Sequence, residues 1–440
     1  MVTWKSIVPL LFLAALVIFE ERVSVPSCVI VPRDDDVEES GIESKELKVM
    51  MVSNLLLMGS EARYLNVYFR DSYTTKFFRH VGSRFRSMNR FKRRKFEHSG
   101  KEESSFKSFE RLKPDMLVVL GDISARGSEF TSGKWLSVLQ QFQRILGPFL
   151  GLPLHVILGD RDIGECSKLN ARSVEWITRN LPGLDSSGSG TFEMSNISFV
   201  SLNAVAMLCG NNDLRFSIEK LIERESLDLQ AYTKEKEGKV VHDTVGDNNF
   251  LNFKWRENLM QSGSGPVLLL HFPLHRTRSS KCGKDVPKGS LFPSPHGHPK
   301  IQDNRGHAGP GPYELFQTLP PNATEYIFQA LKPSGSEIYR GTNREGKELT
   351  WIVFSAHSHE FCDHIHRDGI REVTVPAMTW DARDDPGFIV ASFARNRAVT
   401  VSQCSLARES RVLMAYGSVL ILLISTALIA SRHLLMNPVR

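Results

Sequence analysis

The fold of this chain is decided by the stretch DMLVVLGD, from Asp115 to Asp122. Its apolar run has the length of a buried strand and stops at the pair Gly121-Asp122. Downstream, apolar residues at three- and four-residue spacing predict the buried face of a helix: Trp135, Val138, Leu139, Phe142, Ile145 and Leu146. A second short apolar run, Leu154 to Leu158, stops at Gly159-Asp160. Strand, helix and strand in this order indicate a βαβ unit and a layered α/β fold.

Further short apolar runs predict more strands on both sides of this unit. They are Val49–Val52, Ile197–Leu202, Val267–Leu270, Trp351–Phe354, Val373–Val375 and Phe388–Phe393. A helix is expected near Tyr73–Phe78. Residues 80–106 are basic without clear periodicity and predict a flexible insertion, with a phosphate- or membrane-binding patch as the alternative. Residues 278–312 predict a long exposed loop, whose His296, His298 and His307 are expected to be solvated rather than metal ligands.

Both ends of the chain carry uncharged apolar segments. Ser6 to Phe19 spans about 14 residues between Lys5 and Glu20, so residues 1–22 predict a signal sequence or signal anchor. Val412 to Ser431 spans about 20 residues, enough for a transmembrane helix at 412–431. This pattern predicts a lumenal domain at 45–396 and a cytoplasmic tail at 432–440. Glycosylation sequons at Asn196 and Asn322 agree with that topology.

Composition argues for a folded domain and against nucleic acid as a partner. Hydrophobic residues make up 41% and charged residues 24% of the chain, which is ordinary for a globular core. Much of the net charge of +6 lies in Arg79–Lys95, and a lumenal address makes nucleic-acid binding unexpected. The six cysteines show no CxxC spacing for zinc, and in an oxidising lumen some would pair. Cys209 with Cys282 is the pairing we expect.

Five side chains that can bind metal follow predicted strands. They are Asp122, Asp160, His271, His357 and His359. Strand ends are rigid and can place ligands as accurately as a metal ion requires. Carboxylate oxygen mixed with imidazole nitrogen suits Mn²⁺, Zn²⁺ or Fe rather than a soft thiolate site. The sequence therefore predicts a divalent metal site at this set of strand ends.

The order of these motifs resembles the calcineurin-like metallophosphoesterase superfamily. The matching positions are Gly121-Asp122, Gly159-Asp160-Arg161-Asp162, His271 and Ala356-His357-Ser358-His359. Further stretches resemble the branch that remodels GPI anchors: Phe199–Val205, His271–Leu274 and Val375–Trp380. The resemblance covers about residues 48–395. It implies a four-layer α/β sandwich, with two mixed β-sheets flanked by helices and with terminal membrane segments.

The resemblance also implies roles for the site residues. Such enzymes use two metal ions to bind a phosphate and to activate the attacking water. Asp122 would bridge the two ions, and the second ion would also be held by Asp160, His271 and His357. His359 would belong to the first ion. Asp162 would orient its neighbours through hydrogen bonds.

Three positions depart from the family pattern. The first family motif falls at Asn54-Leu55-Leu56, where Asn54 offers a neutral carbonyl oxygen and Leu56 offers no ligand. Asp160 stands where the family has Asn, and its carboxylate can still bind metal. Arg161 replaces the His that protonates the leaving group, and a guanidinium can hold phosphate charge but cannot act as a general acid. One metal site is therefore predicted to be intact and the first site to be damaged.

Two functions stay open from the sequence. The first is a divergent lumenal metallophosphoesterase of the endoplasmic reticulum or Golgi membrane, acting on a membrane lipid or glycolipid phosphodiester. By resemblance, that substrate would be ethanolamine phosphate on a GPI-anchor mannose, and Mn²⁺ would be the ion, with Zn²⁺ or Fe as alternatives. The second is a pseudo-phosphoesterase that binds phosphorylated glycolipid or GPI-anchored cargo without hydrolysis. Metal stoichiometry and turnover discriminate between them.

Overall fold

The structure is a computed structural model. It describes residues 4–23, 26–30, 46–59, 73–74, 114–149, 151–209, 213–238, 256–257, 266–276, 318–331, 351–366, 369–394 and 399–436. The insertion predicted at 80–106 and the loop predicted at 278–312, with its three histidines, lie outside these residues, as does most of the helix expected near 73–78.

The first sheet contains the predicted βαβ unit. Its strands are, in spatial order, β1 (Ser27–Ile30), β13 (Val399–Ser405), β12 (Gly387–Phe393), β2 (Leu47–Val52), β3 (Met116–Leu120) and β4 (Leu154–Ile157). β2, β3 and β4 are parallel, whereas β12, β13 and β1 pair antiparallel. Helix α4 (Ser132–Leu146) joins β3 to β4 and buries all six residues of the predicted face. Every residue of β3 is buried, which explains its continuous apolar run.

The second sheet is also mixed. Its order is β10 (Cys362–Ile365), β11 (Ile370–Thr374), β9 (Trp351–Ser355), β8 (Val267–Leu270), β6 (Ile197–Leu202), β5 (Gly190–Met194) and β7 (Arg256–Glu257). β11, β9, β8 and β6 are parallel neighbours, and the remaining strands pair antiparallel. The strands predicted near residues 197, 267, 351 and 373 are therefore confirmed at the centre of this sheet.

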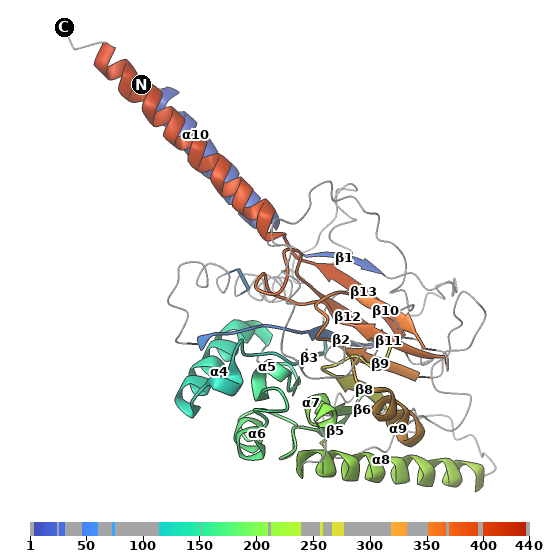
Figure 1. Ribbon diagram of the computed structural model, residues 1–440. Coiled ribbons are helices and arrows are strands. Elements are labelled where there is room, and N and C mark those ends of the chain that lie inside the picture. Colours follow the sequence, from blue (N-terminus) through green and yellow to red (C-terminus); the bar gives the residue numbers. More distant parts are fainter. Residues whose placement is uncertain are drawn as a thin grey trace, which may run out of the picture.

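The two sheets pack face to face around one core. The ring of Phe393 on β12 lies edge-on to Phe199 of β6 at 5.8 Å and to Phe354 of β9 at 6.4 Å between centroids. Helices α4 and α6 (Ala171–Thr178) lie on the side of the first sheet, and α8 (Asp213–Gly238) and α9 (Pro321–Leu331) lie below the second (Figure 1). The predicted fold class, two mixed sheets flanked by helices, is confirmed.

Disulfides correct one prediction and extend the domain. Cys209 is bonded to Cys166, with 5.0 Å between their Cα atoms, so the expected pairing of Cys209 with Cys282 is wrong. The fold brings the loop after residue 163 beside the end of α7 (Ala204–Leu208), a contact that sequence spacing does not show. A second disulfide joins Cys28 on β1 to Cys404 on β13. Both strands lie outside the predicted boundaries of 45–396, so the folded domain is wider than predicted.

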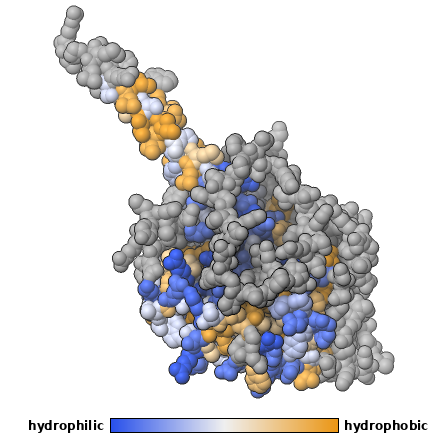
Figure 2. Space-filling view, viewed as in Figure 1, coloured by the Kyte–Doolittle hydropathy of each residue, from blue (hydrophilic) through white to orange (hydrophobic). Residues whose placement is uncertain are grey.

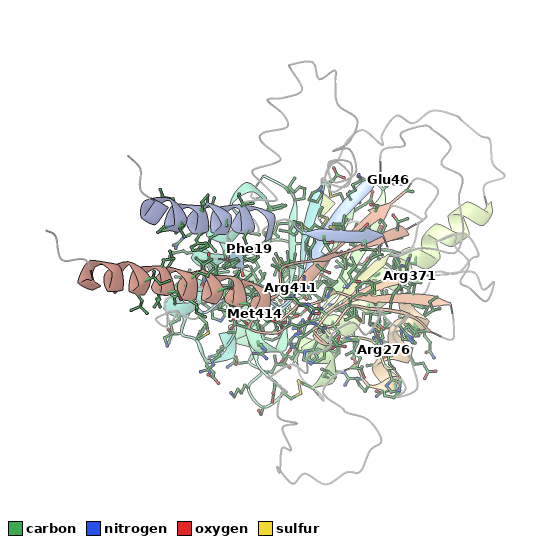
Figure 3. All side chains as sticks on the ribbon, turned by 90° about the horizontal axis from the view of Figure 1, so that it is seen from above. Phe19, Glu46, Arg276, Arg371, Arg411 and Met414 are labelled. Atoms are coloured by element: carbon green, nitrogen blue, oxygen red, sulfur yellow. A yellow bond between two sulfur atoms is a disulfide. The ribbon has the colours of Figure 1, made fainter. Side chains whose placement is uncertain are left out.

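A pair of long helices projects from the domain. Helix α10 (Glu409–Met436) contains the stretch Glu409–Ile429, which is long and apolar enough to cross a membrane. Helix α1 (Trp4–Val23) runs beside it in the opposite direction, as both views of the ribbon show (Figures 1 and 3). The uninterrupted apolar part of α1, Val8–Phe19, is shorter than a full span. The projection presents an apolar surface, unlike much of the described face of the domain (Figure 2).

Candidate metal centre

The site forms where strands of both sheets end. β2, β3 and β4 of the first sheet lead into the loops that carry Asn54, Asp122 and Asp160, and β8 and β9 of the second lead into His271 and His357. Within each sheet these strands are parallel to one another, so their carboxyl ends lie at the same edge. The face-to-face packing of the sheets brings the two edges together.

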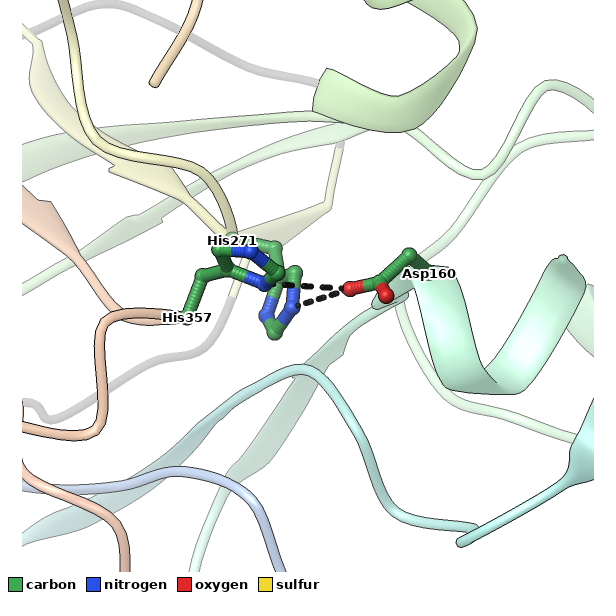
Figure 4. Close-up of side chains that lie close together, drawn as sticks. All are labelled: Asp160, His271 and His357. Carbon is green, nitrogen blue, oxygen red and sulfur yellow. Dashed lines mark hydrogen bonds and ion pairs between the residues drawn. The ribbon is translucent and has the colours of Figure 1, made fainter. Parts of the chain in front are cut away.

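Three of the predicted ligands converge on one point. The ligand atoms of Asp160, His271 and His357 all lie within 4.8 Å of one another (Figure 4). Oδ1 of Asp160 is 3.0 Å from Nε2 of His271 and 3.2 Å from Nδ1 of His357. One carboxylate oxygen and two imidazole nitrogens form a donor set that suits a divalent transition ion. The residues present therefore fit one ion at this point.

The orientation of His271 supports a ligand role. Its Nδ1 lies 2.8 Å from the carbonyl oxygen of Leu120, which can only accept a hydrogen bond. A ring hydrogen therefore resides on Nδ1, and Nε2, the nitrogen left to bind an ion, faces Asp160. Histidines that bind metal are commonly held in this way, by a carbonyl or carboxylate behind the ring.

The charges at the site are concentrated and buried. Burial raises the pKa of the Asp122 carboxyl to about 7, although the neighbouring His271 acts in the opposite direction. Burial would lower the pKa of His271, but the charge of Asp122 and the hydrogen bond and charge of Asp160 raise it to about 9. Burial also opposes ionisation of Asp160, yet hydrogen bonds from His271 and His357 hold its pKa far below the usual range. The carboxylates thus favour a positive charge between them.

Two glycines make the close approach of the loops possible. A Cβ atom on Gly121 would lie 2.3 Å from Nδ1 of His271, and the φ of this glycine is +86°. A Cβ atom on Gly159 would lie 2.1 Å from Oδ1 of Asp122. Glycine is therefore a steric requirement of the site at both position 121 and position 159.

Unfavourable backbone conformations gather at the same loops. Seven non-glycine residues in the described part of the chain have positive φ. Five of them belong to the site: Asn54, Leu56, Asp122, His357 and His359. Such conformations cost about 1–3 kcal/mol each and persist only where surrounding contacts enforce them. Their clustering marks these strand ends as a functional region, including the two positions whose side chains depart from the family pattern.

Asp162 lies behind the site. Its buried carboxylate accepts hydrogen bonds from the backbone N–H groups of Ser124 at 2.8 Å, Gly159 at 3.0 Å and Ile123 at 3.3 Å. Because these groups belong to the loops after β3 and β4, Asp162 fixes the two loops relative to each other. This is the geometry that an orienting role requires.

The remaining predicted residues lie beside the group of three. Oδ1 of Asp122 is 3.5 Å from Nε2 of His271. The Arg161 guanidinium lies on the other side of Asp122, with its Nε 3.7 Å from Oδ2. The rings of His357 and His359 are 6.4 Å apart between centroids. Burial, His357 and Arg161 together lower the pKa of His359 to about 4.

One segment connects the site to helix α10, and no sequence signal predicted that connection. At one end, Ala377 donates its backbone N–H to the carbonyl of His359 at 3.1 Å, and Thr379 donates its hydroxyl to the carbonyl of Asn54 at 3.2 Å. At the other end, Oδ1 of Asp384 accepts the N–H of Ser410, in the first turn of α10, at 2.9 Å. We call residues 377–385 the bridging segment. The sequence resemblance included part of it, but the hydrogen bonds cross long stretches of chain and leave no local pattern.

Comparison with known proteins agrees with this chemistry at the level of the superfamily. No protein-family model matches the chain. Metallophosphoesterase 1 of Cricetulus griseus is 26% identical over 318 residues, which is 71% of this chain and 67% of that protein. Metallophosphoesterase 1 of Mus musculus is 26% identical over 328 residues, which is 73% of this chain and 69% of that protein.

One solved structure is distantly similar. A dimetal phosphatase from Danio rerio matches 81% of this chain and 98% of its own, at 10% identity and a TM-score of 0.34. The sequence relatives, together with the group of three ligands, support a relationship between this chain and the metallophosphoesterase superfamily.

Proposed function

We propose that this chain is a metal-dependent phosphoesterase that acts on a phosphodiester at a membrane surface. The observation that carries the proposal is the convergence of Asp160, His271 and His357 at the strand ends. Ethanolamine phosphate on a GPI-anchor mannose is the first substrate to test, and Mn²⁺ is the first ion, with Zn²⁺ or Fe as alternatives. The relatives named Metallophosphoesterase 1 support the reaction class.

The chain's own residues account for phosphate binding and for the alignment of the site. A divalent ion held by the three ligands would supply Lewis-acid charge to the phosphate ester. The side chain of Arg161 is 46% exposed, so its guanidinium is free to pair with phosphate oxygens outside the buried cluster. Asp162 holds the loops that carry Asp122 and Asp160 in register.

The bridging segment supports a membrane-bound substrate. It contacts the backbone of Asn54 and His359 at one end and the start of α10 at the other. An ester on a lipid or on a lipid-anchored protein would therefore reach the site while its anchor stays in the bilayer.

The lumenal location is part of the same proposal. The two disulfides between described residues, Cys28–Cys404 and Cys166–Cys209, are typical of an oxidising compartment. The sequon residues Asn196 and Asn322 are both exposed. We propose the endoplasmic reticulum or Golgi membrane, with the domain lumenal, the C-terminal tail cytoplasmic and GPI-anchored cargo as the substrate carrier.

The test uses the full chain in detergent. Bound Mn²⁺ and hydrolysis of bis(p-nitrophenyl) phosphate are measured for the wild type and for the double variant Asp160→Ala, His357→Ala. We expect the double variant to lose both ion binding and turnover. The control Asp228→Ala removes an exposed carboxylate on α8 and should keep both. Turnover that survives in the double variant would exclude this site as its source.

A second candidate function is phosphate-ester binding without hydrolysis. It is favoured by Asn54, Leu56 and Arg161, which stand where the family has ligands and an acid. Under this alternative, the wild type binds Mn²⁺ and phosphate through the same three ligands, but its turnover equals that of the double variant.

A further inference from the structure

The half of the site around Asp122 that faces away from His271 is built differently from the ion-binding half. Asn54 is fully buried there, and its side-chain Nδ2 donates a hydrogen bond to Oδ2 of Asp122 at 3.0 Å. Nε of Arg161 lies 3.7 Å from the same oxygen, and its backbone N–H donates to Oδ1 at 3.1 Å. Asp122 therefore already meets an amide donor and a guanidinium on this side.

A second divalent ion fits this half poorly. Because the Asn54 amide turns its N–H toward Asp122, an ion at Oδ2 would face amide hydrogens instead of the carbonyl oxygen. Leu56, buried at the other motif position, has no ligand atom. Within the described residues, neither Asp122 nor His359 belongs to a group of three or more ligand atoms that lie within 4.8 Å of one another.

The charge of Arg161 adds to this mismatch. A guanidinium stays protonated at any pH at which the protein is folded. A divalent ion a few ångströms away would be repelled, and the repulsion is strong beside a buried carboxylate where water screens little. The same charge, half-exposed, is suited to a phosphate oxygen, and a guanidinium can pair with two of them at once.

We infer that the centre holds one divalent ion, and that the Arg161 guanidinium, with the Asn54 amide, takes the place of a second ion beside Asp122. Arg161 then supplies the second positive charge that binds the phosphate group of the substrate. The inference rests on the proposed function for the first ion, which the group of three holds. It goes beyond that function because it fixes the number of ions at one and gives the place of a second ion to Arg161 and Asn54.

Two buried acceptor atoms are possible ligands for a second ion. Oδ1 of Asn54 and Nδ1 of His359 are buried and accept no hydrogen bond from the described residues. If the Asn54 amide were turned over, these atoms could join Asp122 around a second ion. Counting ions therefore decides between the two arrangements, and does so without any measure of activity.

The first experiment counts Mn²⁺ bound by the full chain in detergent, using calorimetry and elemental analysis. We expect one ion per chain. Two ions per chain would overturn the inference and leave the proposed function intact. Absence of any bound ion would overturn both.

The second experiment measures binding of inorganic phosphate to the Mn²⁺-loaded chain. Arg161→Met should still bind one ion but bind phosphate at least about tenfold more weakly, the loss expected for a charged hydrogen bond. Arg172→Met is the matched control, because Arg172 is an exposed arginine on α6, and it should bind phosphate like the wild type. Equal phosphate affinity in Arg161→Met and the wild type would overturn the role of Arg161.

The third experiment rebuilds the second ion site. The triple variant Asn54→Asp, Leu56→His, Arg161→His should bind two Mn²⁺ ions. Because a histidine at buried position 56 can impair folding, the double variant Asn54→Asp, Arg161→His is measured alongside and should bind a second ion more weakly. If the folded triple variant still binds a single ion, then the three original side chains are not what excludes the second ion. That result would contradict the inference.

Discussion

Two clusters of polar side chains in the molecule are each built around a carboxylate. In the first, Asp160 meets His271 and His357, and its side chain keeps 20% of its surface exposed. In the second, Glu372 on β11 meets Arg276 and has no exposed surface. The stretch from His271 to Arg276 contributes to both clusters, so one turn of chain serves two different purposes.

The cluster around Glu372 is complete within the protein. Its Oε1 accepts hydrogen bonds from the N–H of Leu274 at 3.0 Å and from the hydroxyl of Ser355 at 2.7 Å. Its Oε2 lies 3.0 Å from Nε of Arg276 and 2.8 Å from Nε2 of His366. Burial would raise the pKa of Glu372, but the charge of Arg276 and the hydrogen bond from His366 lower it to about 2.

The two clusters differ in whether contacts inside the protein already satisfy the carboxylate. A buried charge is tolerated when hydrogen bonds and an opposite charge inside the protein satisfy it, as they do for Glu372. Among the described residues, the Asp160 carboxylate meets only imidazoles and has an open side, so an outside cation can improve its environment. We therefore interpret the Glu372 cluster as the support that holds the turn behind His271, and the Asp160 cluster as the binding site.

The largest expected effect is on the stability provided by the Glu372 cluster, which we call the closed cluster because all its carboxylate contacts lie within the protein. Glu372→Gln should lower the free energy of unfolding by about 3–5 kcal/mol, because Arg276 loses its ionic partner while it stays buried. Denaturant titration of the full chain in detergent measures this loss. Glu325→Gln, on the exposed face of α9, is the control and should change stability by less than about 0.5 kcal/mol. A loss for Glu372→Gln as small as that of the control would contradict the assignment of this cluster as a support.

A third buried polar group is His155 on β4, whose side chain has no exposed surface. Its Nε2 lies 2.8 Å from the hydroxyl of Ser201, and burial lowers its pKa to about 3. In the unfolded chain its pKa is about 6.5, so between these values the unfolded state binds a proton that the folded state does not. This contribution to stability is complete above about pH 6.5 and is lost as the pH falls toward 3.

His155→Gln should remove that acid sensitivity. For the wild type, the share due to His155 amounts to about 2 kcal/mol between pH 7.5 and pH 5. The free energy of unfolding lost between pH 7.5 and pH 5 should therefore be about 2 kcal/mol smaller in the variant than in the wild type. An equal loss of stability in the variant and the wild type would mean that burial does not set the protonation of His155. Other groups would then cause the loss of stability in acid.

The sequence predicted those features that have a local cause. Apolar runs identified the central strands because both faces of those strands are buried, and the helical spacing identified α4. The candidate ligands stand out in the sequence because each follows a strand end. By contrast, β10 and β5 have few apolar residues, and β13 alternates buried with exposed positions over much of its length, so none of them stands out as an apolar run.

The missing parts of the site have non-local causes. The Ser53 hydroxyl donates to the carbonyl of Val375 across 322 residues of chain, and Glu372 reaches Leu274 across 98. No periodicity or motif encodes such contacts. The separation of His359 from the group of three is equally hidden, because motif spacing does not specify where a side chain points. The predicted disulfide partner of Cys209 was wrong because this contact, too, joins segments that are distant in the sequence.

The smallest expected effect concerns the connection between the Asp160 cluster, which we call the open cluster, and helix α10. The carboxylate of Asp384 accepts hydrogen bonds from the N–H and hydroxyl of Ser410, at 2.9 Å and 3.0 Å. Asp384→Ala should weaken the start of α10 by about 1 kcal/mol, as loss of a helix cap does. Because the bridging segment also contacts the site through Thr379, a looser connection should affect only esters that are held in a bilayer.

Hydrolysis of the soluble ester should therefore remain unchanged in Asp384→Ala, while hydrolysis of a phosphodiester headgroup in vesicles falls about fivefold, the equivalent of about 1 kcal/mol. Asp213→Ala, at the exposed start of α8, is the matched control and should leave both rates unchanged. If both rates of Asp384→Ala fall together, the bridging segment supports the site itself. If neither falls, the open side of the Asp160 cluster reaches its substrate without help from α10. Only a selective loss of hydrolysis in vesicles would show that the bridging segment positions the open cluster for substrates in a bilayer. The closed cluster has no such role.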